Sequence, residues 1–296
     1  MNTQFRGTGV ALVTPFKGGK IDFTSLEKLI NHTIDGGLEF LVSLGTTGES
    51  ATLSQQEKLE VLEFTAQIAN GRVPLVAGFG GNDTNKIIQS IKQFHFKGYD
   101  AILSVSPAYN KPTQEGIYRH FMAIEAHAPK PIILYNVPSR TGSNMASLTT
   151  LRLAHASKKF IAVKEASGNL QQCMEIVRGK PESFLVLSGD DLITLPMLGF
   201  GIDGVISVVA NAFPRQFSNM VRFGLAGDFE QARPLHFDLM DIIDLIFVDG
   251  NPAGIKGALE LLGVCNNEVR LPLAELTTST LSNLKEAIQE LLAIPV

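Results

Sequence analysis

Lys164 is the residue whose type and setting in this sequence most suggest chemistry. It ends an apolar run at residues 160–163 and precedes small, turn-forming residues at 166–168. Such a run predicts a buried strand that delivers the lysine to the strand end. Burial favours the uncharged form of an amine, and an uncharged lysine can attack a ketone. For a lone lysine the alternative is a charged side chain that points into water.

Tyr135 ends a second apolar run, and Arg140 follows in the loop beyond it. A guanidinium suits a bidentate contact with a carboxylate. If the two runs are neighbouring strands about 5 Å apart, Tyr135 and Lys164 reach the same small ligand. A phenol beside the lysine can carry the protons that carbinolamine formation and dehydration require. The pair therefore indicates amine catalysis on a 2-keto acid.

Two further segments carry polar side chains. In segment 45–50, glycines let the backbone approach a ligand, while Thr46, Thr47 and free amides can hold a carboxylate. The hydroxyl of Thr46 can also relay protons. Segment 106–112 is stiffened by proline and projects Tyr109. Taken alone, the first segment is equally compatible with an ordinary turn before a helix, and Tyr109 with a packing residue.

The elements that position these residues alternate along the chain, because short apolar runs are followed by amphipathic segments of helix length. This rhythm is typical of βα units and a parallel sheet. The expected strands cover residues 10–13, 40–43, 73–77, 101–105, 132–135, 161–164, 184–187 and 205–208. Their number is the one that a closed (β/α)8 TIM barrel needs, and barrel enzymes place their chemistry on the loops that follow the strands.

Signals for helix starts accompany the strands. Ser54 opens a capping box, and Asp83 and Asp191 are expected to be N-caps. Asp190, beside Asp191, is also expected to cap a helix rather than to act as a catalytic carboxylate. From about residue 210 the strand signal stops, and helical periodicity covers 228–247, 252–262 and 273–292. The chain is expected to divide into a barrel at 1–226 and a C-terminal helical extension at 227–296.

Composition excludes several function classes. The 296 residues carry 25 basic and 29 acidic side chains and no block of like charge, which gives no indication of a nucleic-acid surface or a membrane-surface helix. The two cysteines, Cys173 and Cys265, lack metal spacing and the histidines are scattered, so no metal site is expected. The start lacks a signal-peptide pattern, and no run of about 18 apolar residues follows, which predicts a cytoplasmic protein.

Three segments, 45–49, 135–142 and 163–168, together resemble the signature of the dihydrodipicolinate synthase family of pyruvate-dependent class I aldolases. The similarity of order and spacing runs from Gly9 to about Leu262. It implies condensation of pyruvate with L-aspartate 4-semialdehyde to give 4-hydroxy-tetrahydrodipicolinate, the committed step towards diaminopimelate and lysine. It also implies no metal or organic cofactor, and a homotetramer built as a dimer of dimers, although the sequence does not separate a tetramer from a free dimer.

The same resemblance assigns the catalytic roles. It implies that Lys164 forms a Schiff base with pyruvate and that Tyr135, Thr46 and Tyr109 form the proton relay. Tyr109 is expected to cross from the neighbouring subunit of a tight dimer.

Binding roles are assigned in the same way. Thr47 and its amide are expected to hold the carboxylate of pyruvate, and the carbonyl of Ile206 is expected to face the bound pyruvate. Gly189 is placed among the substrate-binding residues. Arg140 is expected to organise the mouth of the site and to attract the carboxylate of the semialdehyde.

Three other readings compete with this one. N-acetylneuraminate lyase and 2-keto-3-deoxy sugar acid aldolases share the lysine and the tyrosine but take a polyol aldehyde, and Arg140 with the segment 164–167 favours the synthase. A non-catalytic binding module on the same barrel is disfavoured because all four catalytic residues are present. A phosphosugar isomerase or aldolase is disfavoured because the ends of the seventh and eighth expected strands are acidic and neutral, without a phosphate signature.

Departures from the family pattern concern regulation. In lysine-inhibited relatives the inhibitor lies at the dimer interface, and the matching residues here are Ser50, Ala51, Gln55, Lys58, Lys86 and Ala108. Gln55 and Lys58 replace histidines, Lys86 replaces a glutamate and Ala108 a tyrosine. A cationic ligand that meets Lys86 instead of a carboxylate is repelled. We therefore predict weak or absent inhibition by L-lysine.

Overall fold

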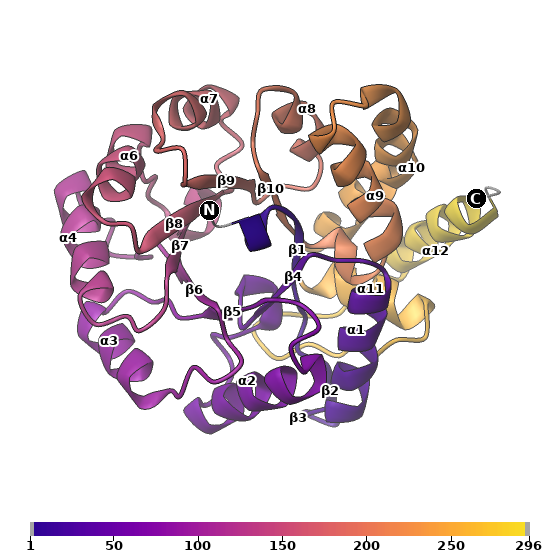
Figure 1. Cartoon of the computed structure of the whole chain (residues 1–296). Helices are drawn as coiled ribbons and strands as arrows, with labels where there is room; N and C mark the ends of the chain where they lie inside the picture. The colour runs from indigo at the N-terminus through magenta and orange to yellow at the C-terminus, as the bar shows by residue number, and fades with distance from the viewer. Residues whose placement is uncertain (1–2, 294–296) are drawn as a thin grey trace.

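The computed structural model describes residues 3–293 and closes eight parallel strands into one barrel. Around the barrel the order is β1-β10-β9-β8-β7-β6-β5-β4, and Figure 1 views the ring with helices outside it. The strands are β1 (Gly7–Ala11), β4 (Phe40–Ser43), β5 (Leu75–Gly78), β6 (Ala101–Val105), β7 (Ile132–Asn136), β8 (Phe160–Glu165), β9 (Leu185–Ser188) and β10 (Gly204–Ser207). This architecture confirms the (β/α)8 TIM barrel expected from the sequence.

Each barrel strand is followed by a helix. These helices are α1 (Phe23–Asp35), α2 (Gln55–Ala69), α3 (Thr84–Gln93), α4 (Gln114–Glu125), α6 (Ser147–Ala156), α7 (Leu170–Gly179), α8 (Thr194–Gly199) and α9 (Pro214–Leu225). Short helical turns are η1 (Thr3–Phe5), η2 (Thr46–Gly48), α5 (Pro138–Thr141) and η3 (Val209–Asn211). None of the helices among residues 3–293 is long and apolar enough to cross a membrane.

Three helices follow the barrel: α10 (Phe229–Val248), α11 (Ala253–Leu261) and α12 (Thr278–Ala293). Helix α10 packs against α9, α11 and α12, so the extension lies on one side of the barrel (Figure 1). Helix α12 begins five residues later than the periodicity predicts, because the hydroxyl of Thr277 accepts from the amide of Thr280 and marks the helix start. Residues 1–2 and 294–296, at the outer ends of the two expected regions, lie outside the described residues.

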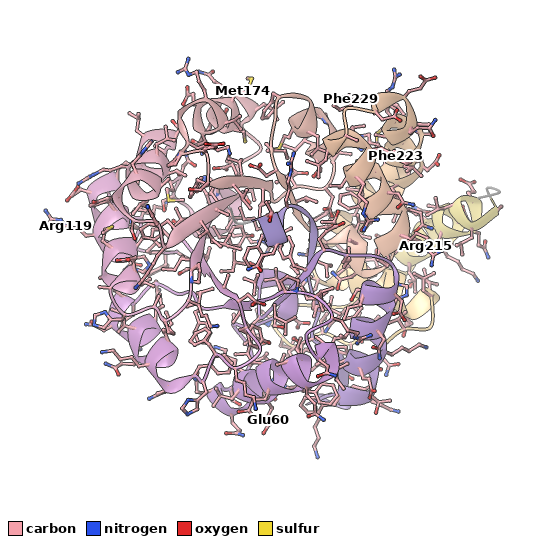
Figure 2. The ribbon with its side chains drawn as sticks, viewed as in Figure 1. Glu60, Arg119, Met174, Arg215, Phe223 and Phe229 are labelled. Atoms are coloured by element: carbon pink, nitrogen blue, oxygen red, sulfur yellow. The ribbon has the colours of Figure 1, made fainter. Side chains whose placement is uncertain are left out.

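The barrel separates two apolar cores. Alternate strand residues point inward, and among these Val42, Leu103 and Ile206 are buried in the barrel interior. Phe5, from η1, joins the interior and meets the ring of Phe40 edge-on at 5.4 Å between centroids. The larger core lies between the strands and the helices. Side chains fill both regions, whereas labelled residues such as Met174 and Arg119 lie at the outer edge of the molecule (Figure 2).

Most strand boundaries agree with the sequence within two residues. Strands β4 and β6 have the predicted bounds, but β1 starts three residues earlier than expected, because Gly7 pairs with Gly204 at the start of β10. A small hairpin of β2 (Phe16–Lys17) and β3 (Lys20–Ile21) was not predicted. Its turn contains Gly18 and Gly19 with φ of 60° and 75°, a conformation typical of tight hairpin turns.

The capping predictions are partly confirmed. Ser54 forms the full capping box, and the carboxylate of Asp83 caps α3. The prediction that Asp191 and Asp190 cap the next helix is wrong, because the N-cap of α8 is Ile193. Asp191 instead accepts from the amides of Val208 and Val209, at 2.9 and 2.7 Å, and burial raises its pKa to about 6. The carboxylate of Asp190 accepts from the amide of Leu192 at 3.1 Å, within its own turn.

Candidate active site

Lys164 and Tyr135 lie side by side at the C-terminal ends of two neighbouring strands. They are register partners in the β7–β8 pair, as the sequence predicted. Nζ of Lys164 lies 4.6 Å from the centroid of the Tyr135 ring. Both residues are buried, with 4% of Lys164 and 6% of Tyr135 exposed. The alternative in which the lysine points into water is therefore wrong.

A buried polar network fixes these two strand ends on the face opposite Lys164 and Tyr135. Glu165 and Asn136, the residues that follow Lys164 and Tyr135, are register partners, and the amide of Asn136 donates to both carboxylate oxygens of Glu165 at 3.1 and 3.0 Å. Gln172, on α7, donates to the same carboxylate at 3.0 Å. Because consecutive strand residues point to opposite faces, this network leaves the lysine and the tyrosine on the interior side.

Gly189 leaves room for the lysine. Its amide donates to the carbonyl of Glu165 at 2.8 Å, which holds the end of β9 against β8. A Cβ at this position would lie 3.0 Å from Cε of Lys164 and 2.6 Å from Cβ of Ala166. Only glycine therefore permits this close approach without displacing the lysine side chain or Ala166.

The two threonines of the β4 loop occupy the turn η2. Thr46 is partly exposed, whereas Thr47 is buried and its hydroxyl accepts from the amide of Asn251 at 3.0 Å. Asn251 comes from the segment between α10 and α11, and its own Oδ1 is buried without a partner in the described chain. The segment between α10 and α11 thus contacts the turn that carries Thr46 and Thr47 directly.

A cavity of about 520 Å³ brings the predicted residues together over the barrel mouth. Thr46, Thr47, Tyr135, Arg140, Lys164, Gly189, Asp190 and Asn251 all line it. Arg140 lies on the short helix α5 at the exposed edge of the cavity, and its guanidinium reaches the carbonyl of Asn251 at 3.4 Å. A cationic group at the rim of a buried amine site suits a substrate that carries a carboxylate.

Two predicted residues lie elsewhere. Ile206 is fully buried in the barrel interior and does not line the cavity. Tyr109 is 89% exposed, has a left-handed φ of 71°, and donates its backbone N–H to Thr141 at 3.3 Å. Within one chain, therefore, the tyrosine that was expected in the proton relay does not join Lys164.

A second cavity, of about 410 Å³, lies next to the first and shares Thr46 and Tyr135 with it. Ser50, Ala51, Gln55, Lys58 and Lys86 line it, which are five of the six positions singled out for regulation, whereas Ala108 does not. Burial lowers the pKa of Lys58.

Sequence reasoning missed the residues that support the site. Asn251 carries no signal beyond an Asn-Pro pair, and Asn136 and Glu165, each one residue beyond an expected strand, carry no signal that they contact each other. No group of three or more histidine, cysteine, aspartate or glutamate side chains within residues 3–293 is arranged to hold a metal ion.

Comparison with known proteins agrees with this geometry. The chain is 54% identical over 270 residues to a 4-hydroxy-tetrahydrodipicolinate synthase of Flavobacterium psychrophilum, covering 91% of this chain and 92% of the relative. It is 48% identical over 289 residues to the synthase of Parabacteroides distasonis, with 97% of each chain covered. The crystal structure of dihydrodipicolinate synthase from Aquifex aeolicus superposes with a TM-score of 0.94 at 42% identity, covering 97% of this chain and 98% of that one. The model of the dihydrodipicolinate synthetase family matches residues 4–291, and the chain belongs to that family.

Proposed function

We propose that this enzyme condenses pyruvate with L-aspartate 4-semialdehyde through a Schiff base on Lys164, giving 4-hydroxy-tetrahydrodipicolinate. The observation that carries the proposal is the buried amine of Lys164, 4.6 Å from the ring centroid of Tyr135, in a cavity that opens past Arg140. The synthases that this chain resembles catalyse the reaction by name, at 44–54% identity. N-acetylneuraminate lyase and sugar acid aldolases, the nearest alternatives, would share Lys164 and Tyr135 but would take a polyol aldehyde as acceptor.

In the first half of the reaction the uncharged amine of Lys164 attacks C2 of pyruvate. The phenol of Tyr135 donates the proton that allows the carbinolamine to lose water, and the hydroxyl of Thr46 relays protons onward. Thr47 and its amide hold the carboxylate of pyruvate, and an imine between pyruvate and Lys164 results. The imine withdraws electrons from the neighbouring methyl group and acts as the electron sink of the reaction.

In the second half the imine loses a methyl proton and becomes an enamine. The enamine carbon attacks the aldehyde of the semialdehyde, whose carboxylate binds Arg140. The amino group of that substrate then attacks the imine carbon and displaces Lys164 as the ring closes. The free enzyme is thereby regenerated without a separate hydrolytic step.

Tyr109 completes the relay in a neighbouring subunit. The 89% exposure of its side chain, on the loop after β6, supports a role in a second copy. We accordingly propose a homo-oligomer, a tetramer built as a dimer of dimers.

Other features of the proposal follow the family. The reaction runs without a metal or organic cofactor, since the lysine imine supplies the electron sink. The expected division into a barrel at 1–226 and an extension at 227–296 is kept as a proposal, with the addition that the extension contributes Asn251 to the cavity. A cytoplasmic location also stays a prediction.

The test is an acceptor competition. Pyruvate-dependent turnover of aspartate semialdehyde is followed through a coupled reductase that consumes NADPH, with N-acetylmannosamine and glyceraldehyde as acceptors in parallel. We expect a strong preference for the semialdehyde, and this preference should fall in the Arg140→Ala variant. A preference for a sugar aldehyde would retain the Schiff base but move the enzyme to the lyase branch.

A further inference from the structure

We propose that the buried ion pair between Glu49 and Lys256 is a positioning unit that holds Thr46 and Thr47 in their pyruvate-binding geometry. This inference rests on the function proposed above. It assigns to the C-terminal extension a part in substrate binding beyond the contact made by Asn251.

The ion pair is buried, and both of its side chains make further polar contacts. Nζ of Lys256, on α11, lies 2.5 Å from Oε1 of Glu49, and the two side chains are 0% and 1% exposed. The same ammonium donates to the carbonyl of Glu268 at 2.8 Å and lies 4.2 Å from the centroid of the Phe16 ring. Oε2 of Glu49 accepts from the backbone amide of Arg270 at 3.0 Å. Both carboxylate oxygens are therefore bound to the C-terminal segment.

Glu49 is coupled to the threonines through the backbone. It is the residue that ends η2, and its amide donates to the carbonyl of Thr46 at 3.1 Å. Its φ of 52° and ψ of 33° lie in the left-handed region, which is unfavourable by about 1 kcal/mol for a residue with a side chain. The buried carboxylate holds Glu49 in this conformation, so the ion pair sets how the turn ends and where both hydroxyls point.

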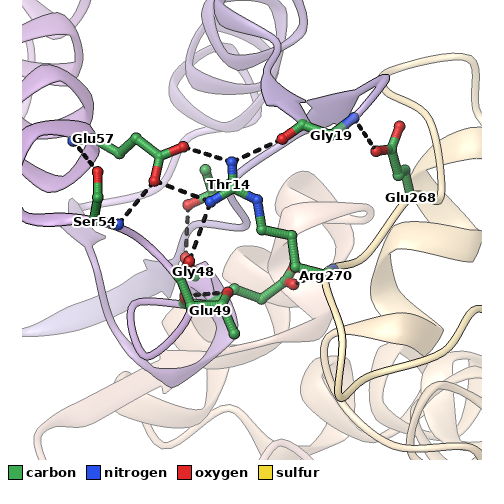
Figure 3. Close-up of polar contacts among 9 residues, drawn as sticks. Thr14, Gly19, Gly48, Glu49, Ser54, Glu57, Glu268 and Arg270 are labelled. Carbon is green, nitrogen blue, oxygen red and sulfur yellow. Dashed lines mark hydrogen bonds and ion pairs between the residues drawn. The ribbon is translucent and has the colours of Figure 1, made fainter.

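A second layer of contacts surrounds the pair. The guanidinium of Arg270 donates to Glu57 at 2.5 and 3.0 Å and to the carbonyl of Thr52 at 3.1 Å, and it reaches Gly19 as well (Figure 3). The hydroxyl of Thr14 donates to the carbonyl of Gly48 at 2.7 Å (Figure 3). These contacts hold other parts of the turn, whereas Glu49, the residue that ends it, is held by the ion pair.

A buried ion pair is not needed for stability alone. Desolvation of two charges opposes their attraction, and apolar residues of similar volume often serve equally well, whereas removing one partner leaves a buried charge unpaired. Burial indeed lowers the pKa of Lys256, with Glu49 acting in the opposite direction. If the pair only joined two segments, replacing both charged residues by neutral ones would not affect the binding of pyruvate. If the pair positions the threonines, the same replacement should weaken that binding.

The experiment measures the pyruvate concentration that gives half-maximal borohydride trapping on Lys164. The variants are Lys256→Met and the double variant Glu49→Gln with Lys256→Met, which leaves no unpaired charge and keeps the chain folded if the single variant fails. Lys180→Met is the matched control, because Lys180 pairs with Asp203 at 3.4 Å with side chains 14% and 17% exposed, next to the N-terminal ends of β9 and β10. Thermal unfolding is recorded for each variant.

We expect the half-saturating concentration to rise about tenfold in Lys256→Met, and severalfold in the double variant, as for a small displacement of binding groups. Lys180→Met should be less stable but should trap pyruvate at the wild-type concentration. A folded double variant with wild-type half-saturation would overturn the proposal, and so would an equal rise in Lys180→Met. Failure of the wild type to trap pyruvate would instead refute the function proposed above.

Discussion

The loops that follow β4 and β6 both carry residues of the proposed site, but the chain holds them in opposite ways. The β4 loop is fixed by a buried ion pair at Glu49, by Asn251 on Thr47 and by Arg270 on its outer turn. The β6 loop projects Tyr109, whose side chain is 89% exposed. The residues proposed to bind pyruvate through the β4 loop thus lie together within one chain, whereas the proposed proton relay requires Tyr109 from a second copy.

The largest expected effect concerns the exposed loop. Replacement of Tyr109 by phenylalanine should lower kcat about 100-fold, the usual contribution of one proton-transfer group. If the tyrosine serves the neighbouring subunit, mixing Tyr109→Phe with Lys164→Ala subunits should restore activity. Random mixing makes half of the dimers hybrid, each with one complete site of two, so about a quarter of the wild-type activity should return. Mixtures that stay inactive after proven subunit exchange would place Tyr109 in its own chain's site.

A smaller effect is expected in the fixed loop. Thr47→Val removes a hydroxyl that accepts from Asn251 at 3.0 Å and is proposed to bind the carboxylate of pyruvate. The half-saturating pyruvate concentration should rise about tenfold, which corresponds to about 1.4 kcal/mol for one buried hydrogen-bonding group. Steady-state kinetics measure this, with Thr150→Val as the control, a buried threonine on α6 whose hydroxyl has no partner in the described chain. An unchanged concentration would remove Thr47 from pyruvate binding.

The contacts that Arg270 makes with Glu57 and with the same loop should stabilise the fold to an extent that depends on pH. The guanidinium of Arg270 lowers the pKa of Glu57 from 4.5 to about 2. Because the folded-state value is depressed, the stabilisation is complete above pH 4.5 and is lost as the pH falls towards 2. Arg270→Gln should lower the free energy of unfolding by about 1 kcal/mol at neutral pH, the upper range for partly exposed pairs. In urea unfolding, a difference between wild type and variant that did not shrink on acidification would contradict this role.

The smallest expected effect concerns the cavity beside the β4 loop. Lys58 and Lys86 line it, and a second cation is repelled by fixed positive charge. L-lysine at submillimolar concentration should therefore change the turnover rate by less than about twofold, since repulsion offsets its other contacts. Half-inhibition in that range would show that the replaced residues do not decide lysine binding. Lys86→Glu, which restores a carboxylate, is the variant that should gain inhibition.

The sequence predicted the parts of the site that lie at strand ends. Parallel strands bring their C-terminal ends to one edge of the sheet, so an apolar run that ends in Tyr135 and another that ends in Lys164 were enough to predict their proximity. The same logic located Thr46 and Thr47.

The supports were not predictable in this way. Lys256 and Glu49 are 207 residues apart, and Asn251 and Thr47 are 204 apart, and no periodic pattern links such positions. Asp191 was misassigned because an aspartate before a helix is typical of an N-cap, whereas its carboxylate binds amides beyond β10 that only the closed barrel brings near. Tertiary contacts of this kind appear only once the fold is known.

The central claim is that Lys164 is the amine that binds pyruvate. The direct test is reduction with borohydride in the presence of pyruvate, followed by peptide mass spectrometry, in the wild type and in Lys164→Ala. The account predicts one pyruvate-derived adduct, on the peptide that contains Lys164, and neither adduct nor turnover in the variant. An adduct on another lysine, or trapping that persists in folded Lys164→Ala, would contradict it.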